Sequence, residues 1–547
     1  MVALKGQGLQ DNKLRNDERL LNVPRIPRGP GSPIVDLGYT QYQGTELANG
    51  ITQWLGMRYA APPVGNLRFR APEDPVPNPS LQIADKHGSV CLPTGSTTIS
   101  NGFAEDCLFV DVYAPTKARQ GHNSLLPVYV FIQGGGFNSN SNANYNGSGL
   151  ITASDLNIVV VTFNYRVGPY GFLASKEVQD NGDLNVGLKD QRKLFKWVQK
   201  YIQEFGGNPN SVTIGGDSAG AASVDLHLSA YGGRNDHLFH AAAAESQSFG
   251  VQFTIEGSQY QYNALVARAG CNSTEDTLTC LRNLTAAELQ SININIPSPG
   301  SGGDPPLYMY SNVIDGDFTQ DFTYKLYKEG KFIKVPVIFG DDTNGGTIFT
   351  PRDTDSVAAM NEFLRDQFPN LSDTQLAQID YYYPKAEQFP NTGEYWRAVS
   401  NAYGQMRYMC PGLYISSAYS KTLTPSWNYR YNVEDPAQVA SGLGVPHTVE
   451  VNAIWGPENV NGAAPASYST PLNRNIVPLM QGYWTSFIRT HNPNTYRIPG
   501  SPFWQEWIPP LMNRIRFETN TTTMEIVDQD TQIHCGYLES IGIILQQ

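Results

Sequence analysis

The clearest chemical signal in the sequence is a serine inside the pentapeptide Gly-Asp-Ser-Ala-Gly, residues 216–220. The preceding residues 211–214 read as a strand, and an Ala-rich stretch typical of a helix follows. A Gly-x-Ser-x-Gly sequence between a strand and a helix is typical of a tight turn that raises the serine Oγ above the edge of a sheet. We therefore expect Ser218 to be a nucleophile rather than only the residue that caps the helix.

Three consecutive glycines, residues 134–136, follow an apolar run at 127–132. Backbone N–H groups that have no Cβ beside them can converge on an oxyanion. A triple glycine alone is more often a flexible turn, but here it stands between a buried strand and the serine pentapeptide. We expect Gly135 and Gly136, together with Ala219, to form an oxyanion hole for attack on an ester carbonyl.

The base that activates the serine is expected among the late histidines, because the chain order in such sites is nucleophile, acid, histidine. His447 lies in a Gly-Val-Pro-His-Thr-Val-Glu loop, residues 444–450, after a predicted strand, which suits a projecting base. His491 lies in a polar turn and His534 adjoins Cys535, so we interpret both as structural or exposed. His447 is therefore the predicted general base.

The segments that must position these residues alternate between strand-like and helix-like patterns. Residues 190–205, for example, carry apolar side chains at helical spacing and end at two glycines. Such alternation predicts an α/β fold with a large, mostly parallel central sheet and helices on both faces. Residues 1–33, rich in proline and charge, predict an irregular N-terminal arm, and residues 34–547 predict one domain because no linker interrupts them.

Charge and hydropathy exclude several classes of partner. The formal net charge is -12, whereas a nucleic-acid surface or a protein bound to anionic membranes needs an excess of Lys and Arg. No apolar run approaches the ~18 residues of a membrane-spanning helix. Neither a cluster of metal ligands nor a phosphate-binding loop stands out, so we expect no cofactor and no metal, and a small-molecule substrate as the partner.

Two further stretches carry a family resemblance. Residues 55–70 read Leu-Gly-Met-Arg-Tyr-Ala-Ala-Pro-Pro-Val-Gly-Asn-Leu-Arg-Phe-Arg, and residues 105–115 read Glu-Asp-Cys-Leu-Phe-Val-Asp-Val-Tyr-Ala-Pro. With the serine pentapeptide and the triple glycine, they resemble the signatures of the type-B carboxylesterase/lipase family, which includes cholinesterases and secreted fungal esterases and lipases. Gln133, where many members have histidine or tyrosine, is closest to the fungal members.

The resemblance extends over nearly the whole chain from about residue 33. It implies an α/β-hydrolase fold and a serine carboxylic-ester hydrolase that works through an acyl-enzyme on Ser218, with His447 as general base. Two other functions stay open: a biosynthetic enzyme of the same fold that performs acyl transfer, elimination or cyclisation, and a non-catalytic cholinesterase-like binding module. The retained Ser218, His447 and triple glycine disfavour the second of these.

The cysteines and the glycosylation sequons both favour secretion. Six cysteines allow many pairings from sequence alone, and the resemblance implies the pairs Cys91–Cys107, Cys271–Cys280 and Cys410–Cys535. The chain also has five Asn-x-Ser/Thr sequons, at Asn146, Asn272, Asn283, Asn370 and Asn520. Disulfides and N-glycans belong to proteins that leave the reducing cytosol, so the sequence predicts a secreted glycoprotein.

The sequence departs from the family at the acid of the triad. The family has a glutamate before a Gly-Thr or Gly-Ser pair, and its position in the stretch Gly-Asp-Asp-Thr-Asn-Gly-Gly-Thr, residues 340–347, is occupied by Gly345. Losing the acid of a serine hydrolase triad can cost ~10⁴ in rate. Asp342 is the first candidate to replace it, and the alternatives are Asp341 on the same loop, Glu450 or another carboxylate from elsewhere in the chain. Otherwise the acid is absent, and the enzyme is slow or performs chemistry that needs less from its base.

The loop that the Cys91–Cys107 pair would close gives the main substrate clue. Residues 92–106 are short and rich in Ser, Thr and Gly, whereas the family's lipases have a longer apolar flap there. The loop therefore favours an esterase with a permanently accessible gorge. It also contains no tryptophan, which disfavours choline esters because the cholinesterases hold their choline-binding aromatic residue in this loop.

Overall fold

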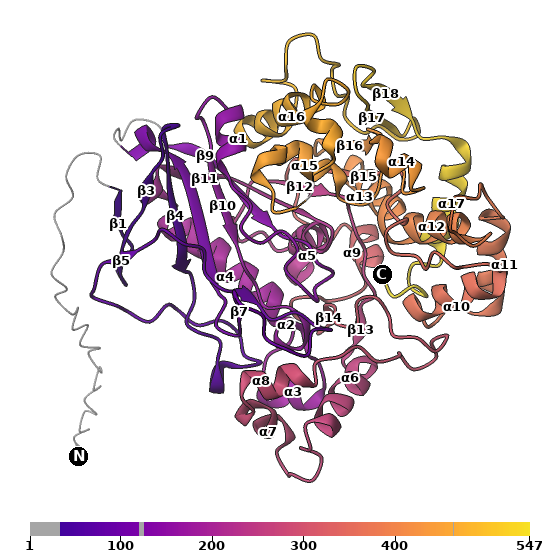
Figure 1. Ribbon diagram of the computed structural model, residues 1–547, viewed down its shortest axis with the longest axis horizontal. Coiled ribbons are helices and arrows are strands. Elements are labelled where there is room, and N and C mark those ends of the chain that lie inside the picture. Colours follow the sequence, from indigo (N-terminus) through magenta and orange to yellow (C-terminus); the bar gives the residue numbers. More distant parts are fainter. Residues whose placement is uncertain (1–32, 120–124, 463) are drawn as a thin grey trace, which may run out of the picture.

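A computed structural model describes residues 33–119, 125–462 and 464–547. The predicted N-terminal arm, residues 1–33, lies outside these residues apart from Pro33. The centre of the molecule is an 11-stranded sheet in the order β18-β17-β16-β15-β12-β11-β9-β10-β8-β4-β3 (Figure 1). Its strands are β3 (Thr45–Glu46), β4 (Ile51–Arg58), β8 (Phe109–Pro115), β9 (Leu126–Ile132), β10 (Val159–Phe163), β11 (Gly207–Asp217), β12 (Ala241–Glu245), β15 (Val337–Asp342), β16 (Ser426–Tyr431), β17 (Asn513–Phe517) and β18 (Thr523–Ile526).

The sheet is parallel through its middle and antiparallel at its edges. Strands β10, β9, β11, β12, β15, β16 and β17 pair in parallel, whereas β8, β4 and β3 on one side and β18 on the other are antiparallel to their neighbours. The central strands are rich in β-branched and aromatic residues and are buried, as expected for strands covered on both faces. Three small sheets complete the strands: β1 (Ile34–Asp36) with β2 (Gln41–Gln43) and β5 (Gln82–Ile83), β6 (Val90–Cys91) with β7 (Phe103–Ala104), and β13 (Phe253–Thr254) with β14 (Val313–Ile314).

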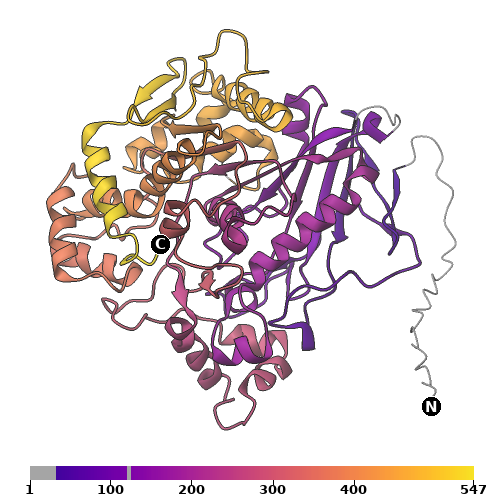
Figure 2. The same cartoon turned by 180° about the vertical axis from the view of Figure 1, so that it is seen from behind.

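Helices cover both faces of the central sheet, as predicted. One face packs against α4 (Val186–Tyr201), α5 (Ala219–Gly233) and α13 (Cys410–Ser420), and the other against α1 (Ser148–Ala153), α15 (Val449–Trp455) and α16 (Ile476–Thr490). Seen from behind, the magenta helix α4 lies across the purple strands (Figure 2). The prediction of a helix at 190–205 was close, because α4 begins four residues earlier. The last part of the predicted span, Ile202–Phe205, is a 3₁₀ turn that ends at Gly206, whose φ is 85°.

The remaining helices surround this central layer. They are α2 (Gly168–Phe172), α3 (Lys176–Asn181), α6 (Ile255–Arg268), α7 (Thr277–Asn283), α8 (Ala286–Ser291), α9 (Thr323–Lys328), α10 (Val357–Gln367), α11 (Asp373–Tyr382), α12 (Trp396–Gly404), α14 (Pro436–Ala440) and α17 (Gln529–Ser540). Helices α10, α12, α13 and α17 enclose a third apolar core beside the sheet. No helix in the described part of the chain is long and apolar enough to cross a membrane.

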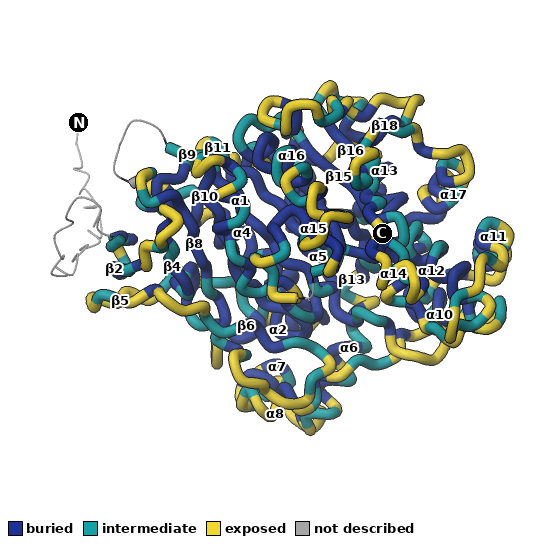
Figure 3. The backbone as a smooth tube through the Cα atoms, turned by 45° about the horizontal axis from the view of Figure 1, so that its top comes forward, coloured by how far each residue is buried: buried dark blue, intermediate teal, exposed yellow. Residues whose placement is uncertain are grey.

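A short π-helical turn, η4 (Gln405–Met409), connects α12 to α13. π-helical turns are rare and occur frequently at functional sites, because one extra residue per turn changes which side chains face inward. Here the turn directs Arg407 and Tyr408 into the protein, where both are buried. Buried backbone, in dark blue, fills the middle of the molecule, and the exposed segments lie mostly at its periphery (Figure 3).

Candidate active site

Ser218 stands at a strained turn between β11 and α5, as the pentapeptide predicts. Its backbone has φ 56° and ψ -118°, a conformation that costs energy for a residue with a side chain. The neighbouring glycines are needed because β9 passes close by: a Cβ on Gly220 would lie 1.9 Å from the carbonyl oxygen of Ile132, and one on Gly216 would lie 2.5 Å from the same oxygen. The strand, the turn and the helix together hold Ser218 at the carboxyl end of the sheet.

The triple glycine lies directly beside this serine. A Cβ on Gly134 would be 3.0 Å from the Cβ of Ser218, so the two segments touch. The N–H of Gly134 already donates to Asp217 Oδ1 and to Asn142 Oδ1, each at 3.0 Å. The first glycine therefore fixes the loop instead of offering its N–H to a substrate.

Gly135 and Gly136 have the free N–H groups that an oxyanion hole needs. Their φ angles are 113° and 61°, a region that glycine adopts without strain. The carbonyl of Gly135 accepts hydrogen bonds from the N–H groups of Asn138 and Ser139, at 3.0 and 2.9 Å. Neither Gly135 nor Gly136 donates an N–H to any residue that the structure describes.

His447 lies in the loop before α15 and is buried, with 6% of its surface exposed. The ring of Tyr408 stacks on the imidazole at a centroid distance of 4.1 Å, and Phe349 meets it edge-on at 5.3 Å. Its Nε2 is buried and has no hydrogen-bond partner among the described residues. Burial and, second, the nearby Arg407 lower the pKa of His447 to about 3, so the ring is neutral and can accept a proton at neutral pH.

The other two late histidines have structural surroundings. His491 ends helix α16 in the left-handed conformation, with φ 57°. His534 lies on α17 and contacts the rings of Tyr382 and Tyr383, at 5.0 and 4.9 Å between centroids. These positions agree with their interpretation as structural residues.

Gly345, the family's acid position, lies on the loop that follows β15. A Cβ placed on it would be 3.6 Å from Cδ2 of Tyr408 and 3.7 Å from the carbonyl oxygen of Asp342, which are ordinary contact distances. A side chain therefore fits at this position, beside the tyrosine that stacks on His447. Within the described residues, no hydrogen bond joins His447 to Asp341, Asp342 or Glu450.

Asp342 and Glu450 instead meet at a third residue, Ser246. The Ser246 Oγ lies 2.7 Å from Asp342 Oδ2 and 2.7 Å from Glu450 Oε1, and it accepts the N–H of Thr448 at 3.0 Å. A hydroxyl has one proton to donate, so two contacts of this length require a proton on one carboxyl group. Burial, and then the charge of Glu450, raise the pKa of Asp342 well above its usual range.

A neutral Asp342 completes this network. Its carboxyl group donates to Ser246, Ser246 donates to Glu450, and Tyr429 OH donates to Glu450 Oε1 at 2.9 Å. Thr448 follows His447 directly, so the network anchors the backbone of the histidine loop. Asp342 and Glu450 thus hold the loop in place, and among the described residues neither has a hydrogen bond to the imidazole.

Three side chains near the site escape sequence reasoning: Tyr308, Arg407 and Tyr408. Tyr308 covers Gly136, because a Cβ on that glycine would lie 2.0 Å from the tyrosine ring. The Cζ of Arg407 is 5.3 Å from the centroid of the same ring. Only Arg407 gives a signal in the sequence, as a charge inside the otherwise apolar Met-Arg-Tyr-Met run at 406–409.

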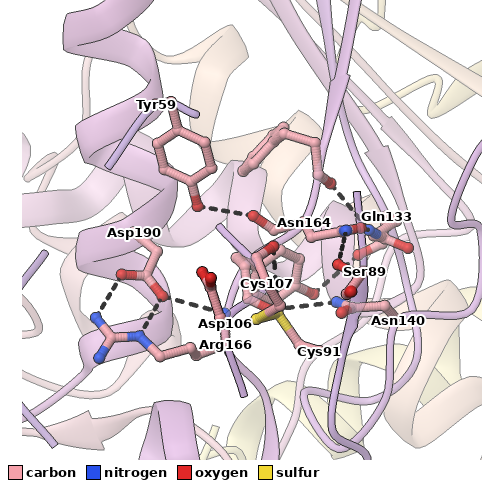
Figure 4. Close-up of a disulfide and its surroundings, with 12 residues drawn as sticks. Tyr59, Ser89, Cys91, Asp106, Cys107, Gln133, Asn140, Asn164, Arg166 and Asp190 are labelled. Atoms are coloured by element: carbon pink, nitrogen blue, oxygen red, sulfur yellow. Dashed lines mark hydrogen bonds and ion pairs between the residues drawn. A yellow bond between two sulfur atoms is a disulfide. The ribbon is translucent and has the colours of Figure 1, made fainter. Parts of the chain in front are cut away.

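The Cys91–Cys107 disulfide lies close to the strand that leads into the triple glycine (Figure 4). There Gln133 Nε2 donates to the carbonyl of Phe163 and to Asn164 Oδ1, at 2.9 and 2.8 Å, and so joins neighbouring loops. The structure also forms the two other pairs that the resemblance implies, Cys271–Cys280 and Cys410–Cys535, and leaves no free cysteine among the described residues.

Comparisons with known proteins identify the family of the chain. A model of the carboxylesterase family matches residues 31–535. "Secreted lipase 4" of Gibberella zeae is 31% identical over 501 residues, which are 85% of each chain, and "Lipase 4" of Diutina rugosa is 34% identical over 383 residues, 62% of this chain and 69% of that protein. The crystal structure of Aspergillus niger EstA superposes with a TM-score of 0.91 at 43% identity, covering 94% of this chain and 99% of that one.

The family model spans most of the chain, the relatives include proteins named as lipases, and the solved structure of EstA has the same fold. The mostly parallel sheet with helices on both faces is the α/β-hydrolase fold that the sequence predicts. The chain belongs to the carboxylesterase family and is a serine hydrolase of carboxylic esters.

Proposed function

We propose that Ser218 is the nucleophile and His447 the general base of this hydrolase. His447 removes the Ser218 proton, Oγ attacks the ester carbonyl, and the N–H groups of Gly135, Gly136 and Ala219 hold the oxyanion. The protonated imidazole then gives its proton to the departing alcohol. Water, activated by the same histidine, releases the acid from the acyl-enzyme.

One observation carries this proposal: a serine in a strained turn lies in contact with a loop whose second and third glycines have unused N–H groups. Unpaired backbone N–H groups beside a buried turn are costly. They are expected where a ligand completes their hydrogen bonds, and an ester carbonyl that becomes an oxyanion does so.

We further propose that the base works without a direct carboxylate partner. Stacking on Tyr408 and the edge of Phe349 orient the ring, and the Ser246 network holds its loop. The positive imidazolium that forms during reaction then lacks a stabilising charge. The enzyme is therefore expected to be slow compared with hydrolases that retain the acid.

The proposed substrate is a small, water-soluble ester. The loop between Cys91 and Cys107 is attached to the body: the carbonyl of Pro93 accepts from Gln290 and Asn293, at 2.7 and 3.1 Å, and Thr94 N–H donates to the carbonyl of Asn138 at 2.8 Å. A loop attached in this way is poorly suited to open at an oil surface. Activity is therefore expected to follow dissolved substrate, with no increase when an ester exceeds its solubility.

We also propose that the protein is secreted and that residues 34–547 form one domain around the central sheet. Three disulfides support an oxidising destination. The similarity to a protein named as a secreted lipase supports it further. The continuous sheet, with strands from Thr45 to Ile526, supports a single domain.

The test is hydrolysis of 4-nitrophenyl butyrate by the wild type and by Ser218→Ala, both from a secreting host. Turnover by the wild type that the substitution abolishes, with a butyryl group found on Ser218 by mass spectrometry, is the expected result. Full activity in Ser218→Ala would refute the assignment of the nucleophile. A stable butyryl-enzyme that water does not release would favour the biosynthetic alternative, acyl transfer to another acceptor.

A further inference from the structure

Arg407 is a buried cation without an anionic partner. Only 9% of its surface is exposed, and among the described residues it forms no ion pair with a carboxylate, while its Nε has no hydrogen-bond partner. Its polar neighbours include the phenols of Tyr308, Tyr403 and Tyr408. Charged side chains are almost never fully buried unless they are paired, so an unpaired arginine at this depth calls for a charge that the protein itself does not supply.

The guanidinium borders the active site from the side of the oxyanion hole. It lines a cavity of about 20 Å³ together with Gly136, Tyr308, Ser311 and Gln367. Space of this size holds about one group of the size of a water molecule, such as one oxygen of a carboxylate. Gly136 belongs to the proposed oxyanion hole, so a substrate bound there has this cavity within reach of its chain.

A second contact connects Arg407 to the base. Tyr408, its neighbour in the π-helical turn η4, stacks on the imidazole of His447. The turn therefore places the cation one side chain away from the base and one side chain away from the oxyanion hole. An ordinary α-helical turn would distribute these residues differently around the helix axis.

We propose that Arg407 is a specificity-determining residue that binds a terminal carboxylate of the ester substrate. This inference rests on the proposed function, because it names the substrate class of the same site. A guanidinium makes strong, charge-assisted hydrogen bonds to a carboxylate. In a buried site such a pair discriminates sharply against a neutral analogue, which would leave the arginine without a partner.

Binding of such a substrate also changes the surroundings of the base. The positive charge of Arg407 disfavours protonation of His447, which His447 must undergo during catalysis. A substrate carboxylate beside Arg407 cancels part of that repulsion. A charged substrate would thus supply some of the negative charge that Gly345 does not.

The experiment compares esters that differ only in one charged group. For the acyl arm, 4-nitrophenyl hydrogen glutarate is compared with 4-nitrophenyl pentanoate, which has a methyl group in place of the carboxylate. For the alcohol arm, 4-acetoxybenzoate is compared with 4-methylphenyl acetate. We expect the wild type to prefer the charged member of one pair, and Arg407→Met to reduce that kcat/KM ratio about tenfold or more.

A matched control is Arg489→Met. Arg489 also lies over a tyrosine ring, 3.7 Å from the centroid of Tyr496, but it is on α16, whose buried residues belong to a different apolar core from those of η4. It changes the net charge of the protein by the same amount, so it accounts for long-range attraction of the anion. Ratios that fall equally in both variants, or that do not fall in Arg407→Met, would overturn the proposal.

A binding measurement keeps the inference independent of turnover and of the folding of Arg407→Met. In Ser218→Ala, monomethyl glutarate or 4-acetoxybenzoate is expected to raise Tm, whereas the matched neutral esters methyl pentanoate and 4-methylphenyl acetate are not. Equal shifts from charged and neutral esters would overturn the anion site. If the wild type hydrolyses none of the esters but the charged compounds still raise Tm selectively, the proposed function fails and the anion site stands.

Discussion

Restoring the missing acid is the sharpest test of how this site works. The substitution Gly345→Glu places a carboxylate where the family has one, and the structure has room for it because a Cβ there makes only ordinary contacts, at 3.6 Å or more. The backbone of Gly345 is not in the left-handed region, so a side chain causes no strain. The new carboxylate would extend past Tyr408 toward the imidazole.

The expected gain follows from the role of the acid. Removing the carboxylate from a serine hydrolase triad costs ~10⁴ in rate, which corresponds to about 5 kcal/mol of transition-state stabilisation. Because the loop of this protein was not shaped around a glutamate, we expect part of that gain, a rise in kcat of about 10²- to 10³-fold. The assay is steady-state hydrolysis of 4-nitrophenyl butyrate at pH 7, with Gly345→Gln as the uncharged control of the same size.

The pH profile gives a second, independent signature. In the wild type the pKa of His447 is about 3, so the base stays neutral and kcat/KM is expected to stay level as the pH falls from 7 to about 4. A nearby carboxylate favours the protonated imidazole and raises that pKa. As the pH is lowered, Gly345→Glu should therefore lose its kcat/KM at a higher pH than the wild type does.

Two results would refute this reasoning. Folded Gly345→Glu with the activity of Gly345→Gln would show that the missing acid does not limit the rate. A folded Asp342→Asn or Glu450→Gln variant that loses activity about 10⁴-fold would show that the base already has a carboxylate partner. The Ser246 network predicts a milder loss for both variants.

Three further predictions concern other parts of the protein. Ser246→Ala removes the group that joins Thr448 to two buried carboxyl groups, and we expect it to lower the free energy of unfolding by about 1–3 kcal/mol, measured by urea unfolding; an unchanged midpoint would contradict the network. Burial, and second the charge of Glu450, raise the pKa of Asp217 to about 8 in the folded protein. The unfolded chain loses this proton near pH 4, whereas the folded protein keeps it up to about pH 8. The wild type is therefore expected to lose stability as the pH rises from 4 to 8. Asp217→Asn should reduce this loss, which is measured as the difference between the free energies of unfolding at pH 5 and pH 8. An equally large difference in the variant would show that other groups cause the pH dependence. Glycans should occur at the four exposed sequons but not at Asn146, which is partly buried and accepts the N–H of Ser148. Mass spectrometry of the secreted protein checks this. A fully occupied Asn146 would contradict the prediction and show that the glycan is added before this contact forms. The four sequons are Asn272, Asn283, Asn370 and Asn520.

Local patterns in the sequence predicted the parts of the site that local geometry determines. A strand, a serine between glycines and a helix can fold in few ways, so the strained turn at Ser218 follows from the pentapeptide. The same holds for the parallel strands β9 and β10 at the centre of the sheet, whose runs are almost entirely apolar. The antiparallel edges escaped prediction for two reasons. The strands β3 and β18 are short and partly exposed, and the buried runs of β4 and β8 do not reveal the direction of a strand.

The surroundings of the base could not be predicted, because they depend on contacts between distant segments. Ser246 and Glu450 are 204 residues apart in the chain, and Asp342 comes from a third segment. The sequence suggested Asp342 and Glu450 as acids from their positions near Gly345 and His447. The hydrogen bonds of both carboxyl groups with Ser246 form only when the segments pack together. The same is true of the position of the buried Arg407 in the π-helical turn beside the site.

The bond between Cys410 and Cys535 connects the chemistry of the site to the compartment in which the enzyme works. Cys410 is the first residue after η4, the turn that supplies Arg407 and Tyr408, and Cys535 lies on α17. In a reducing compartment this bond does not form, and among the described residues only apolar packing in the third core holds the turn to α17. The stacking of Tyr408 on the base would then be less well fixed, so the chain is expected to reach full activity only in an oxidising compartment, where the bond can form.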